Sequence, residues 1–577
     1  MISRQFFTAL SVVALLILQG CSILKPGESA EPESVPVAEE TPATPEAPTR
    51  SFERETLYEL LLAEFAGKRN RADVALGKYL KQAHETRDPQ VVERAAYIAR
   101  YLGAHQATLD AAMLWTEIEP ENPAPRELAA TELIRFGKLD EAMGQIDLLM
   151  RNNNGSVNFE FLLQATRSSD METRSQVLNK LTEYSQTRND EKLWFAKGSL
   201  EAMNGNHEQA IDDFDKALSI TPTYSNAILA RTQSMIANGE ADDALKYLGK
   251  QTEEFPRNKR LGVANARYLI QYGQLPAAQK QFERLVEAFP EDGDLLLSLA
   301  LLSWENKMEK DAIQYFNQLI AMDYRTEEAN LYLARIAETR KQYAEAEAHY
   351  RKIGGGPNYA LAQIQLALLY ADTNRTDDAL KSLDAAIAAD PTEELKFLLA
   401  KSEVLARAER NREAVDVLNQ GLTKHPEDAA LLYSRAMLQE KLEQFGAMEA
   451  DLRKVLQLQP NNSAALNALG YTFANRNQRL NEAWELIERA YFLNPNDPAI
   501  IDSMGWIKYR MGENSVALDF LRKAYDAFKD QEIAAHLGEV LWVTGNQQEA
   551  ISVWKQSLEE NPNSKVLQDV MKRFNAD

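Results

Sequence analysis

The last two thirds of the chain repeat one arrangement of small, large apolar and proline positions about every 34 residues. A small residue, replaced once by methionine, recurs at steps of 33 to 35 residues: Ala210, Ala244, Ala278, Ala312, Ala346, Ala379, Ala414, Met448, Ala483, Ala517 and Ala550. Four residues after each stands a large apolar residue: Phe214, Leu248, Phe282, Phe316, Tyr350, Leu383, Leu418, Leu452, Ile487, Leu521 and Trp554. Because four residues make about one helical turn, the pattern predicts an amphipathic α-helix at each place.

A second helix is predicted ahead of each of these helices. Most repeats carry a partner small residue about twelve residues upstream: Gly198, Ala266, Ala300, Ala334, Ala367, Ala436, Gly470, Gly505 and Gly538. Most also carry a proline twelve residues downstream: Pro222, Pro256, Pro290, Pro391, Pro426, Pro460, Pro495 and Pro562. Because proline cannot continue a helix interior, it ends the second helix of each repeat. The pattern thus predicts antiparallel helix pairs whose backbones approach closely at the small residues.

This pattern resembles the tetratricopeptide repeat (TPR) family, and one unit carries six of that family's positions: Trp194, Gly198, Ala210, Phe214, Ala217 and Pro222. The resemblance implies an all-α fold, a TPR superhelical solenoid of antiparallel helix pairs with about eleven units over residues 191–562. Three features depart from the family pattern, namely Tyr324 in place of a proline, the glycines at 354–356, and Met448 at a small site. We expect strain or bending in those units.

The two ends of the array follow the pattern less closely. Residues 52–190 are predicted to form degenerate N-terminal helical repeats, with Gly137 and Ala142 spaced as in the later units, although no register holds between about 151 and 190. Residues 563–577 are predicted to form a C-terminal capping helix, because three apolar residues share one side of it and charges lie on the other: Val566, Val570 and Phe574.

The first residues have the pattern of an export signal. Arg4 precedes an uncharged, mostly apolar stretch over 6–18, and the run at 18–21 ends in Cys21. That run resembles the lipobox of bacterial lipoproteins, which implies that residues 1–20 are a signal peptide and that Cys21 becomes acylated. Two alternatives stay open, an ordinary secretory signal with an unrelated cysteine and an uncleaved anchor.

The residues after the cysteine predict a tethered location. Ser22 and Ile23 stand where an aspartate would direct retention in the inner membrane, so the resemblance implies the outer membrane, facing the periplasm of a Gram-negative bacterium. Residues 21–51 are rich in proline and glutamate, which favour an extended, solvated chain. We expect this segment to be a tether that holds the folded body off the lipid.

Composition argues against several other functions. A net charge of −22 argues against nucleic acid as a partner, because phosphate neutralisation needs clustered lysine and arginine and the sequence has no such run. The six histidines are scattered, no zinc-protease or nucleophile-elbow motif is present, and acylation would consume the only cysteine. We therefore predict no catalytic residue, no metal, no cofactor and no small-molecule substrate, which means that the chain is not an enzyme.

A partner is expected on the first helices of the units, which line the groove in this family. Reading the positions one turn away from the helix-pair contacts gives eight candidates: Phe195, Leu301, Trp304, Tyr433, Tyr471, Trp506, Tyr509 and Trp542. Aromatic side chains are enriched at protein-binding hot spots. The alternative is that these residues fill the space between repeats. None of the corresponding positions carries the lysine of the family's carboxylate clamp, so we do not expect a receptor for chaperone tails.

The whole build resembles the TPR lipoproteins that partner a carboxyl-terminal processing protease. This resemblance implies a scaffold that docks that periplasmic serine protease and presents peptidoglycan hydrolases to it. The alternative is an assembly or export scaffold for a secretin, a pilus or a polysaccharide secretion machine.

Overall fold

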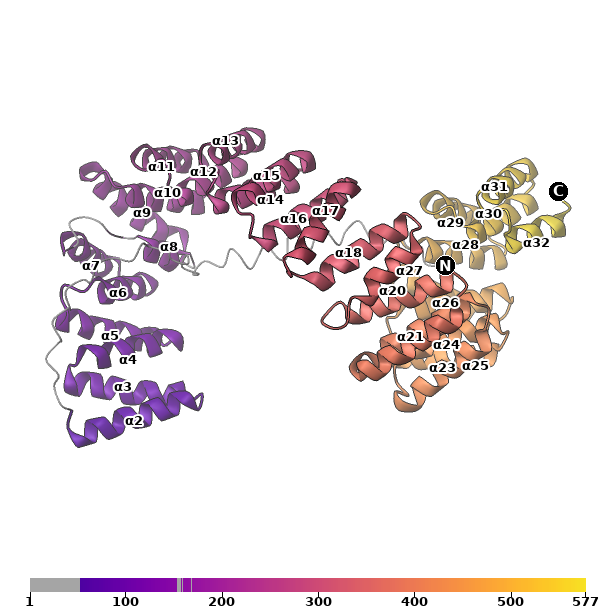
Figure 1. The fold of residues 1–577 in the computed structure, drawn as a ribbon, viewed down its shortest axis with the longest axis horizontal. Coiled ribbons are helices and arrows are strands. Elements are labelled where there is room, and N and C mark those ends of the chain that lie inside the picture. The colour runs from indigo at the N-terminus through magenta and orange to yellow at the C-terminus, as the bar shows by residue number, and fades with distance from the viewer. Residues whose placement is uncertain (1–51, 153–156, 158, 168, 577) are drawn as a thin grey trace. The chain divides into compact units, whose positions relative to one another are not determined.

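The computed structural model describes residues 52–152, 157, 159–167 and 169–576. Cys21, the predicted signal peptide and the predicted tether lie outside these residues. The described residues form α-helices, one short 3-10 helix and no strand (Figure 1). The predicted all-α fold is therefore confirmed. The chain divides into two compact units, unit 1 up to Met322 and unit 2 from Asp323 onward.

The described part of unit 1 contains sixteen helices in chain order. They are α2 (Arg54–Lys68), α3 (Ala72–Thr86), α4 (Pro89–Tyr101), α5 (His105–Ile118), α6 (Pro123–Arg135), α7 (Leu139–Asn152), α8 (Glu160–Thr166), α9 (Met171–Thr187), α10 (Glu191–Met203), α11 (His207–Ile220), α12 (Ser225–Ala237), α13 (Ala241–Glu254), α14 (Lys259–Gln271), α15 (Leu275–Ala288), α16 (Gly293–Glu305) and α17 (Glu309–Ala321). From α10 onward they pair as α10 with α11, α12 with α13, and so on.

Unit 2 continues the same pairing and ends with an unpaired helix. Its elements are α18 (Thr326–Thr339), α19 (Tyr343–Arg351), α20 (Tyr359–Asp372), α21 (Thr376–Ala389), η1 (Pro391–Glu393), α22 (Glu394–Arg407), α23 (Asn411–Lys424), α24 (Ala429–Lys441), α25 (Phe445–Leu458), α26 (Ser463–Asn475), α27 (Leu480–Leu493), α28 (Pro498–Arg510), α29 (Asn514–Ala527), α30 (Gln531–Val543), α31 (Gln547–Glu560) and α32 (Lys565–Phe574). Pairs α10/α11 to α30/α31 occupy the part of the chain with the 34-residue pattern.

Local sequence sets where these helices begin and end. Aspartates at several starts accept hydrogen bonds from backbone N–H groups of the first turn, as Asp190 does for α10 and Asp428 for α24. At the other end, α13 stops two residues before Pro256 and α25 two residues before Pro460. The proline therefore ends the second helix, as the sequence predicts.

Glycine holds the two helices of several pairs close together. A Cβ atom added at Gly198 would lie 2.8 Å from the Phe214 ring, and one at Gly505 would lie 2.6 Å from Leu521. At Gly538 the added atom would lie 2.1 Å from Nε1 of Trp554, which is fully buried. The small residue of the first helix and the large residue of the second helix therefore contact each other within each of these pairs.

The departures from the repeat pattern have different consequences. Met448 is fully buried within a second helix of ordinary length. The turn at Tyr324 places Asp323 and Arg325 in the left-handed region, with φ of 52° and 46°. Helix α19 has only nine residues before the glycine-rich turn. Helix α8 has seven residues and contacts α6 and α10, which explains why no register could be followed near it.

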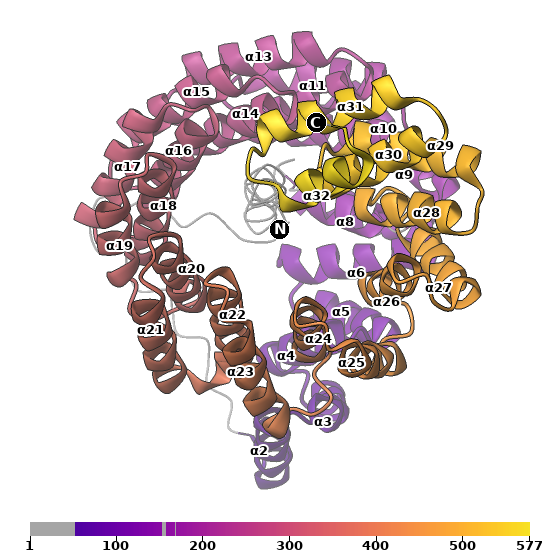
Figure 2. The same ribbon diagram turned by 90° about the vertical axis from the view of Figure 1, so that its right-hand side faces the viewer.

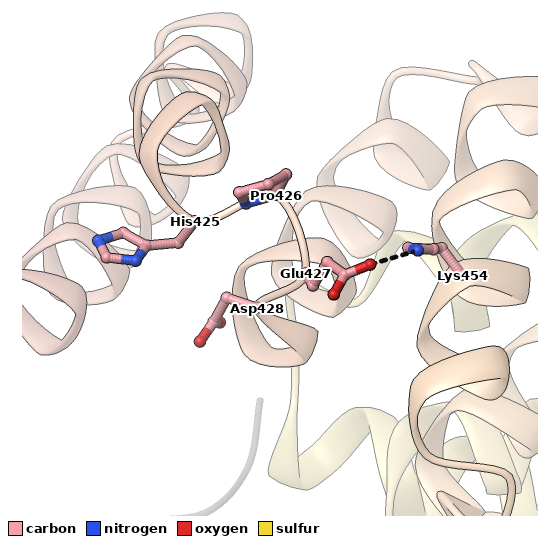
Figure 3. Close-up of a pocket in the computed structure, with 5 residues that line it drawn as sticks. All are labelled: His425, Pro426, Glu427, Asp428 and Lys454. Atoms are coloured by element: carbon pink, nitrogen blue, oxygen red, sulfur yellow. Dashed lines mark hydrogen bonds and ion pairs between the residues drawn. The ribbon is translucent and has the colours of Figure 1, made fainter.

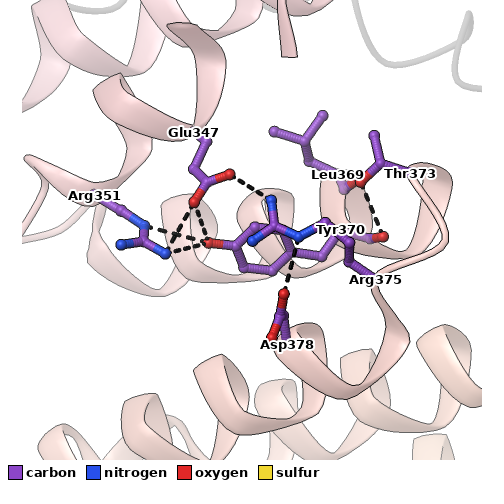
Figure 4. A network of polar contacts seen from close by, with 7 residues as sticks. All are labelled: Glu347, Arg351, Leu369, Tyr370, Thr373, Arg375 and Asp378. Atoms are coloured by element: carbon purple, nitrogen blue, oxygen red, sulfur yellow. Dashed lines mark hydrogen bonds and ion pairs between the residues drawn. The ribbon is translucent and has the colours of Figure 1, made fainter. Parts of the chain in front are cut away.

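A polar network joins the short helix α19 to its neighbours (Figure 4). The Glu347 carboxylate on α19 accepts hydrogen bonds from Arg375 at 2.7 Å and from the Tyr370 hydroxyl at 2.9 Å. Arg351 donates to the same hydroxyl at 2.8 Å. Burial would raise the pKa of Glu347, but the hydrogen bonds from Arg375 and Tyr370 and the charges of Arg375 and Arg351 together outweigh burial and lower the pKa. These contacts hold α19 to α20 and to the start of α21, where the helix itself is short.

The final helix α32 covers the end of unit 2, although by a different face from the one predicted. Leu567, Val570 and Met571 are buried, whereas Val566 is 45% exposed. The prediction that Val566 faces the body is therefore wrong, because the buried stripe follows spacings of three and four residues rather than four alone. Among the described residues, no helix combines the length and apolarity needed to span a membrane.

Candidate protein-binding surface

The first helices of the pairs form one side of unit 2. Helix α20 contacts α22, α22 contacts α24, α26 contacts α28, and α28 contacts α30. Within this unit the second helices lie on the outer side of the row (Figure 2). We call the surface presented by α20, α22, α24, α26, α28 and α30 the inner face of unit 2. Side chains on this face are the ones that a partner lying along the row would meet.

The structure buries part of the predicted groove. Leu301 is 2% exposed and Trp506 is 4% exposed. The other six residues are half-buried: Phe195, Trp304, Tyr433, Tyr471, Tyr509 and Trp542. Leu301 is covered because α16 is apolar on nearly every side and is enclosed along most of its length. The expectation that Leu301 and Trp506 offer surface to a partner is therefore corrected, and the role of the other six stays a prediction.

Two of the half-buried aromatic residues also fill space between helices. The Phe195 ring centre lies 5.9 Å from that of Phe214 and 5.2 Å from that of Tyr224. The Trp542 ring stacks on Trp554 at 5.8 Å. Such contacts give these side chains a role in packing between helices.

A buried polar cluster joins three first helices on the inner face. His536 on α30 contacts both carboxylate oxygens of Asp502 on α28 through Nδ1, at 2.9 and 3.1 Å. Its Nε2 lies 3.3 Å from the Tyr471 hydroxyl on α26, and this hydroxyl donates to Glu532 at 2.7 Å. The Trp506 ring stacks on the imidazole with 4.0 Å between centres. Tyr471 therefore reaches across one whole helix pair to contact α30.

Burial and contacts within the cluster shift the pKa values of its members. Burial by itself would lower the pKa of His536, but the charge and hydrogen bond of Asp502, together with the charges of Glu532 and Glu539, outweigh burial and raise the pKa. Burial and the Glu532 carboxylate hold the pKa of Tyr471 well above its usual range. Tyr471 therefore stays a neutral hydrogen-bond donor. The contacts among Asp502, His536 and Tyr471 stabilise the packing of three helices.

Carboxylates flank this cluster on both sides. On α24, Glu440 accepts a 2.9 Å hydrogen bond from the Thr472 hydroxyl of α26. Burial raises the pKa of Glu440, and the Glu532 carboxylate adds to the rise. On the other side, Glu539 of α30 accepts from the Tyr509 hydroxyl at 3.2 Å and from Arg573 of α32 at 2.5 Å.

Sequence reasoning did not single out most of this cluster. Tyr471, Trp506 and Tyr509 were predicted, whereas Glu440, Glu532 and His536 were not. One signal was present, because Asp502 and His536 are 34 residues apart and so occupy nearly the same place in successive units. The contact between Tyr471 and His536, 65 residues apart, depends on how three pairs stack and leaves no local signal.

The described surface has hollows at turns between helices. One lies at the turn between α23 and α24, lined by His425, Pro426, Glu427, Asp428 and Lys454 (Figure 3). Glu427 pairs with Lys454 at 3.0 Å, and Asp428 caps α24. Within the described part of the chain, no group of three or more histidine, cysteine, aspartate or glutamate residues could hold a metal ion.

Comparison with known proteins identifies the family. The chain is 38% identical over 530 residues to the TPR repeat-containing protein PA4667 of Pseudomonas aeruginosa, covering 91% of this chain and 89% of the relative. This chain belongs to the tetratricopeptide repeat family. Tetratricopeptide repeat models match residues 364–429 and 429–462, and a FAT domain model matches residues 167–367.

Other TPR-containing proteins match over shorter stretches. The type IV pilus assembly protein PilF of Pseudomonas aeruginosa is 29% identical over 181 residues, covering 29% of this chain and 69% of PilF. The crystal structure of a tetratricopeptide repeat protein from Parabacteroides merdae has a TM-score of 0.35 and 17% identity, covering 43% of this chain and 98% of that one. The family matches include no catalytic domain, and a TPR array is a protein-binding scaffold.

Proposed function

We propose that this TPR protein is a non-catalytic adaptor, anchored by a lipid on Cys21 in the outer membrane and facing the periplasm. It docks a periplasmic carboxyl-terminal processing serine protease and presents peptidoglycan hydrolases to it. The observation that carries the scaffold role is the array of eleven helix pairs over residues 191–562, in a chain 38% identical to a TPR protein. The chain's build, with a lipobox-like run, an acidic tether and a TPR array, resembles the outer-membrane lipoprotein LbcA, the partner of such a protease.

The physical role of such an adaptor is to raise effective concentration. Two proteins held on one scaffold meet as if each were present at up to about millimolar concentration. A hydrolase bound beside the protease is therefore cut faster than a free one, although the scaffold itself breaks no bond. The length of the TPR array supports this role, because one chain offers room for more than one partner.

Affinity capture tests the adaptor role. The full chain, recovered with its bound proteins from the periplasmic side of its native host, should carry a carboxyl-terminal processing protease together with cell-wall hydrolases. A purified hydrolase mixed with the chain alone should stay intact and should be cut only when the protease is added. Cleavage by the chain alone would overturn the non-catalytic role, and capture without any protease would overturn the adaptor role.

A matched pair of variants tests the anchor. Cys21→Ser should move the chain from the outer-membrane fraction to the soluble periplasm, because no acyl chain can then be attached. Ser22→Ala, one residue away, keeps the cysteine and should leave the chain in the outer membrane. A Cys21→Ser chain that stays in the membrane fraction would show that the segment is an uncleaved anchor.

An assembly scaffold is the second candidate, and the match to the type IV pilus assembly protein PilF favours it. In that case affinity capture should recover a secretin or other pilus components instead of a protease. Loss of the chain should then reduce piliation and leave the amounts of cell-wall hydrolases unchanged.

A further inference from the structure

Helix α2, the first helix of the described chain, is apolar on two opposite sides. One side packs against α3 and buries Ala63 completely. The other side carries four large apolar residues, whose spacings of three, four and seven residues place them on one helix face. We call them the open face of α2, because each is at least half exposed: Leu57, Tyr58, Leu61 and Phe65. Apolar side chains on both sides of a helix indicate that both sides are covered.

The open face has a defined place in the repeat. Ala63 corresponds to Gly198 of α10, because the large residue Tyr79 follows it sixteen positions later, the same interval as in the α10/α11 pair. Tyr58 and Phe65 therefore stand five residues before and two residues after the small residue of their helix. The later pairs show what normally covers these two places.

Both places are covered in the nine first helices that carry the partner small residue. The residue five before it is at most 4% exposed: Leu193, Leu261, Leu295, Ala329, Ala362, Leu431, Ala465, Ile500 and Ile533. The residue two after it is at most 5% exposed, except for the half-buried Tyr268: Leu200, Leu302, Ile336, Leu369, Leu438, Thr472, Ile507 and Val540. A Cβ atom added at Gly421 of α23 would lie 3.0 Å from Leu431 of α24. The cover is therefore the second helix of the preceding pair, and α2 has the face of an inner repeat.

The segment that precedes α2 does not offer such a helix. From Pro26 to Pro48 no run without proline is longer than five residues, and proline cannot continue a helix interior. The second helices that cover the later pairs mostly have 13 or 14 residues, as α17 and α23 do. The cover of α2 must therefore come from another molecule once residues 1–20 have been removed.

The other end of the array does not supply the cover either. Helix α32 contacts α30 and α31 and buries Leu567, Val570 and Met571 against them. Because this end is already closed, copies of the chain cannot stack head to tail through it. A second copy can cover α2 only with its own α2, in a closed and symmetric pair.

Two copies of α2 fit each other in antiparallel order around Leu61. The two Leu61 side chains then meet at the two-fold axis, and Leu57 of each copy lies opposite Phe65 of the other. Residues 53–55 contain two glutamates and one arginine, whereas residues 68–69 are lysine and arginine. An antiparallel pair places the acidic start of each helix beside the basic end of the other, which favours this order.

The open face offers a modest contact area. Tyr58 and Phe65 are 61% and 59% exposed, and since an aromatic side chain buries about 150 to 250 Å², each offers about 120 Å². With the two half-exposed leucines, a pair of copies buries roughly 800 Å² in total, which is the size of a weak contact. Anchoring both copies to one membrane strengthens such a contact by raising their local concentration.

We propose that a second copy of this chain covers the open face of α2, which makes the protein a symmetric dimer on the membrane. The protein-binding surfaces of both copies stay available, because the contact uses only the first helix of each. The proposal rests on the proposed function only for the lipid anchor, which removes residues 1–20 and holds the copies on one membrane.

Cysteine cross-linking in cell envelopes tests the pair. Leu61→Cys, in the otherwise unchanged full chain, should give a disulfide-linked dimer on mild oxidation, because the two cysteines meet at the two-fold axis. Leu57→Cys is the matched control, since Leu57 is 51% exposed and Leu61 is 50% exposed. Its two copies lie about 12 Å apart along the helices, beyond disulfide reach, so it should give at least about fivefold less dimer.

A second pair of variants tests the contact through its apolar side chains. Phe65→Glu, added to the Leu61→Cys chain, should lower the yield of dimer at least about fivefold, because it places a charge opposite Leu57. Leu493→Glu makes a similar change at an exposed residue of α27 and should alter the yield less than about twofold. Both variants should keep the helicity of the unchanged chain in circular dichroism, since both residues are exposed.

Three results would overturn the proposal. They are the absence of dimer with Leu61→Cys, equal yields from Leu57→Cys and Leu61→Cys, and a yield that survives Phe65→Glu. The first result would leave a lipid surface or the helix of a different protein as the cover of α2.

Failure of the anchor is distinguishable from failure of the dimer. If the anchor fails, the chain leaves the outer-membrane fraction, and the cross-linking comparison is read in the fraction that holds it. The unchanged chain is oxidised in parallel, because dimer formed there would come from a free Cys21 thiol and would contradict acylation. Failure to capture a protease bears on the adaptor role and leaves the dimer standing.

Discussion

Gly538→Ala should destabilise the last helix pair, even though alanine is ordinarily the better helix former. An added methyl group would lie 2.1 Å from Nε1 and 2.4 Å from Cε2 of Trp554, a fully buried and rigid ring. Overpacking of a dense core costs about 1 to 3 kcal/mol, and a contact this short belongs near 3. Alanine regains about 1 kcal/mol of helix propensity. The net loss is therefore about 2 kcal/mol.

Native-state hydrogen exchange measures this loss locally, which matters because long repeat arrays need not unfold as one unit. A loss of about 2 kcal/mol corresponds to exchange roughly 30-fold faster for protected amides of α30 and α31. Gly249→Ala is the matched control, because Gly249 is also helical but an added Cβ has no neighbour within 4 Å. That control should slow exchange in α13 by the helix-propensity gain alone.

A double-mutant cycle separates the clash from other effects. In a Trp554→Leu background, Gly538→Ala should cost much less, since the smaller partner leaves room for the methyl group. If Gly538→Ala stabilises α30 as Gly249→Ala stabilises α13, the pairing of small and large residues does not set the helix spacing and the reasoning is refuted.

Three further predictions concern charges and caps. Lys197→Met should lower the free energy of unfolding by about 3 kcal/mol in chemical denaturation, since Lys197 pairs at 2.7 Å with the fully buried Asp213. An unchanged denaturation midpoint would show that the ion pair of Asp213 with Lys216 is enough to compensate its charge. Asp88→Ala should cost about 1 kcal/mol and speed exchange at the start of α4, where Asp88 accepts two backbone N–H groups; equal exchange would contradict it. The raised pKa of His536 contributes stability that is complete below about pH 6.5 and is lost as pH rises through the higher folded pKa. Asp502→Asn should remove this pH dependence in α30, as measured by hydrogen exchange corrected for intrinsic rates.

Much of the fold was predictable because the repeat signal is local. Each pair is specified by residues within one 34-residue unit, such as Gly198 with Phe214 sixteen positions later. Proline ends a helix because it lacks a backbone N–H, and glycine does so because it readily adopts positive φ; neither effect depends on the rest of the chain. The surface was less predictable, because exposure depends on neighbours. Trp506 occupies a groove position by spacing, yet His536 of the next pair covers it.

The amino-acid sequence by itself determined the helices, their pairing and the TPR architecture. The reason is that helix-ending residues and the spacing of apolar residues along a helix act over one or two helical turns. The tertiary structure alone decided which side chains of the first helices are covered, and it brought Tyr471 to His536 across 65 residues. It also brought Arg573 of the last helix to Glu539, 34 positions earlier in the chain. The physical reason is that burial and ion pairing depend on the stacking angle between successive pairs, a quantity that no single repeat encodes.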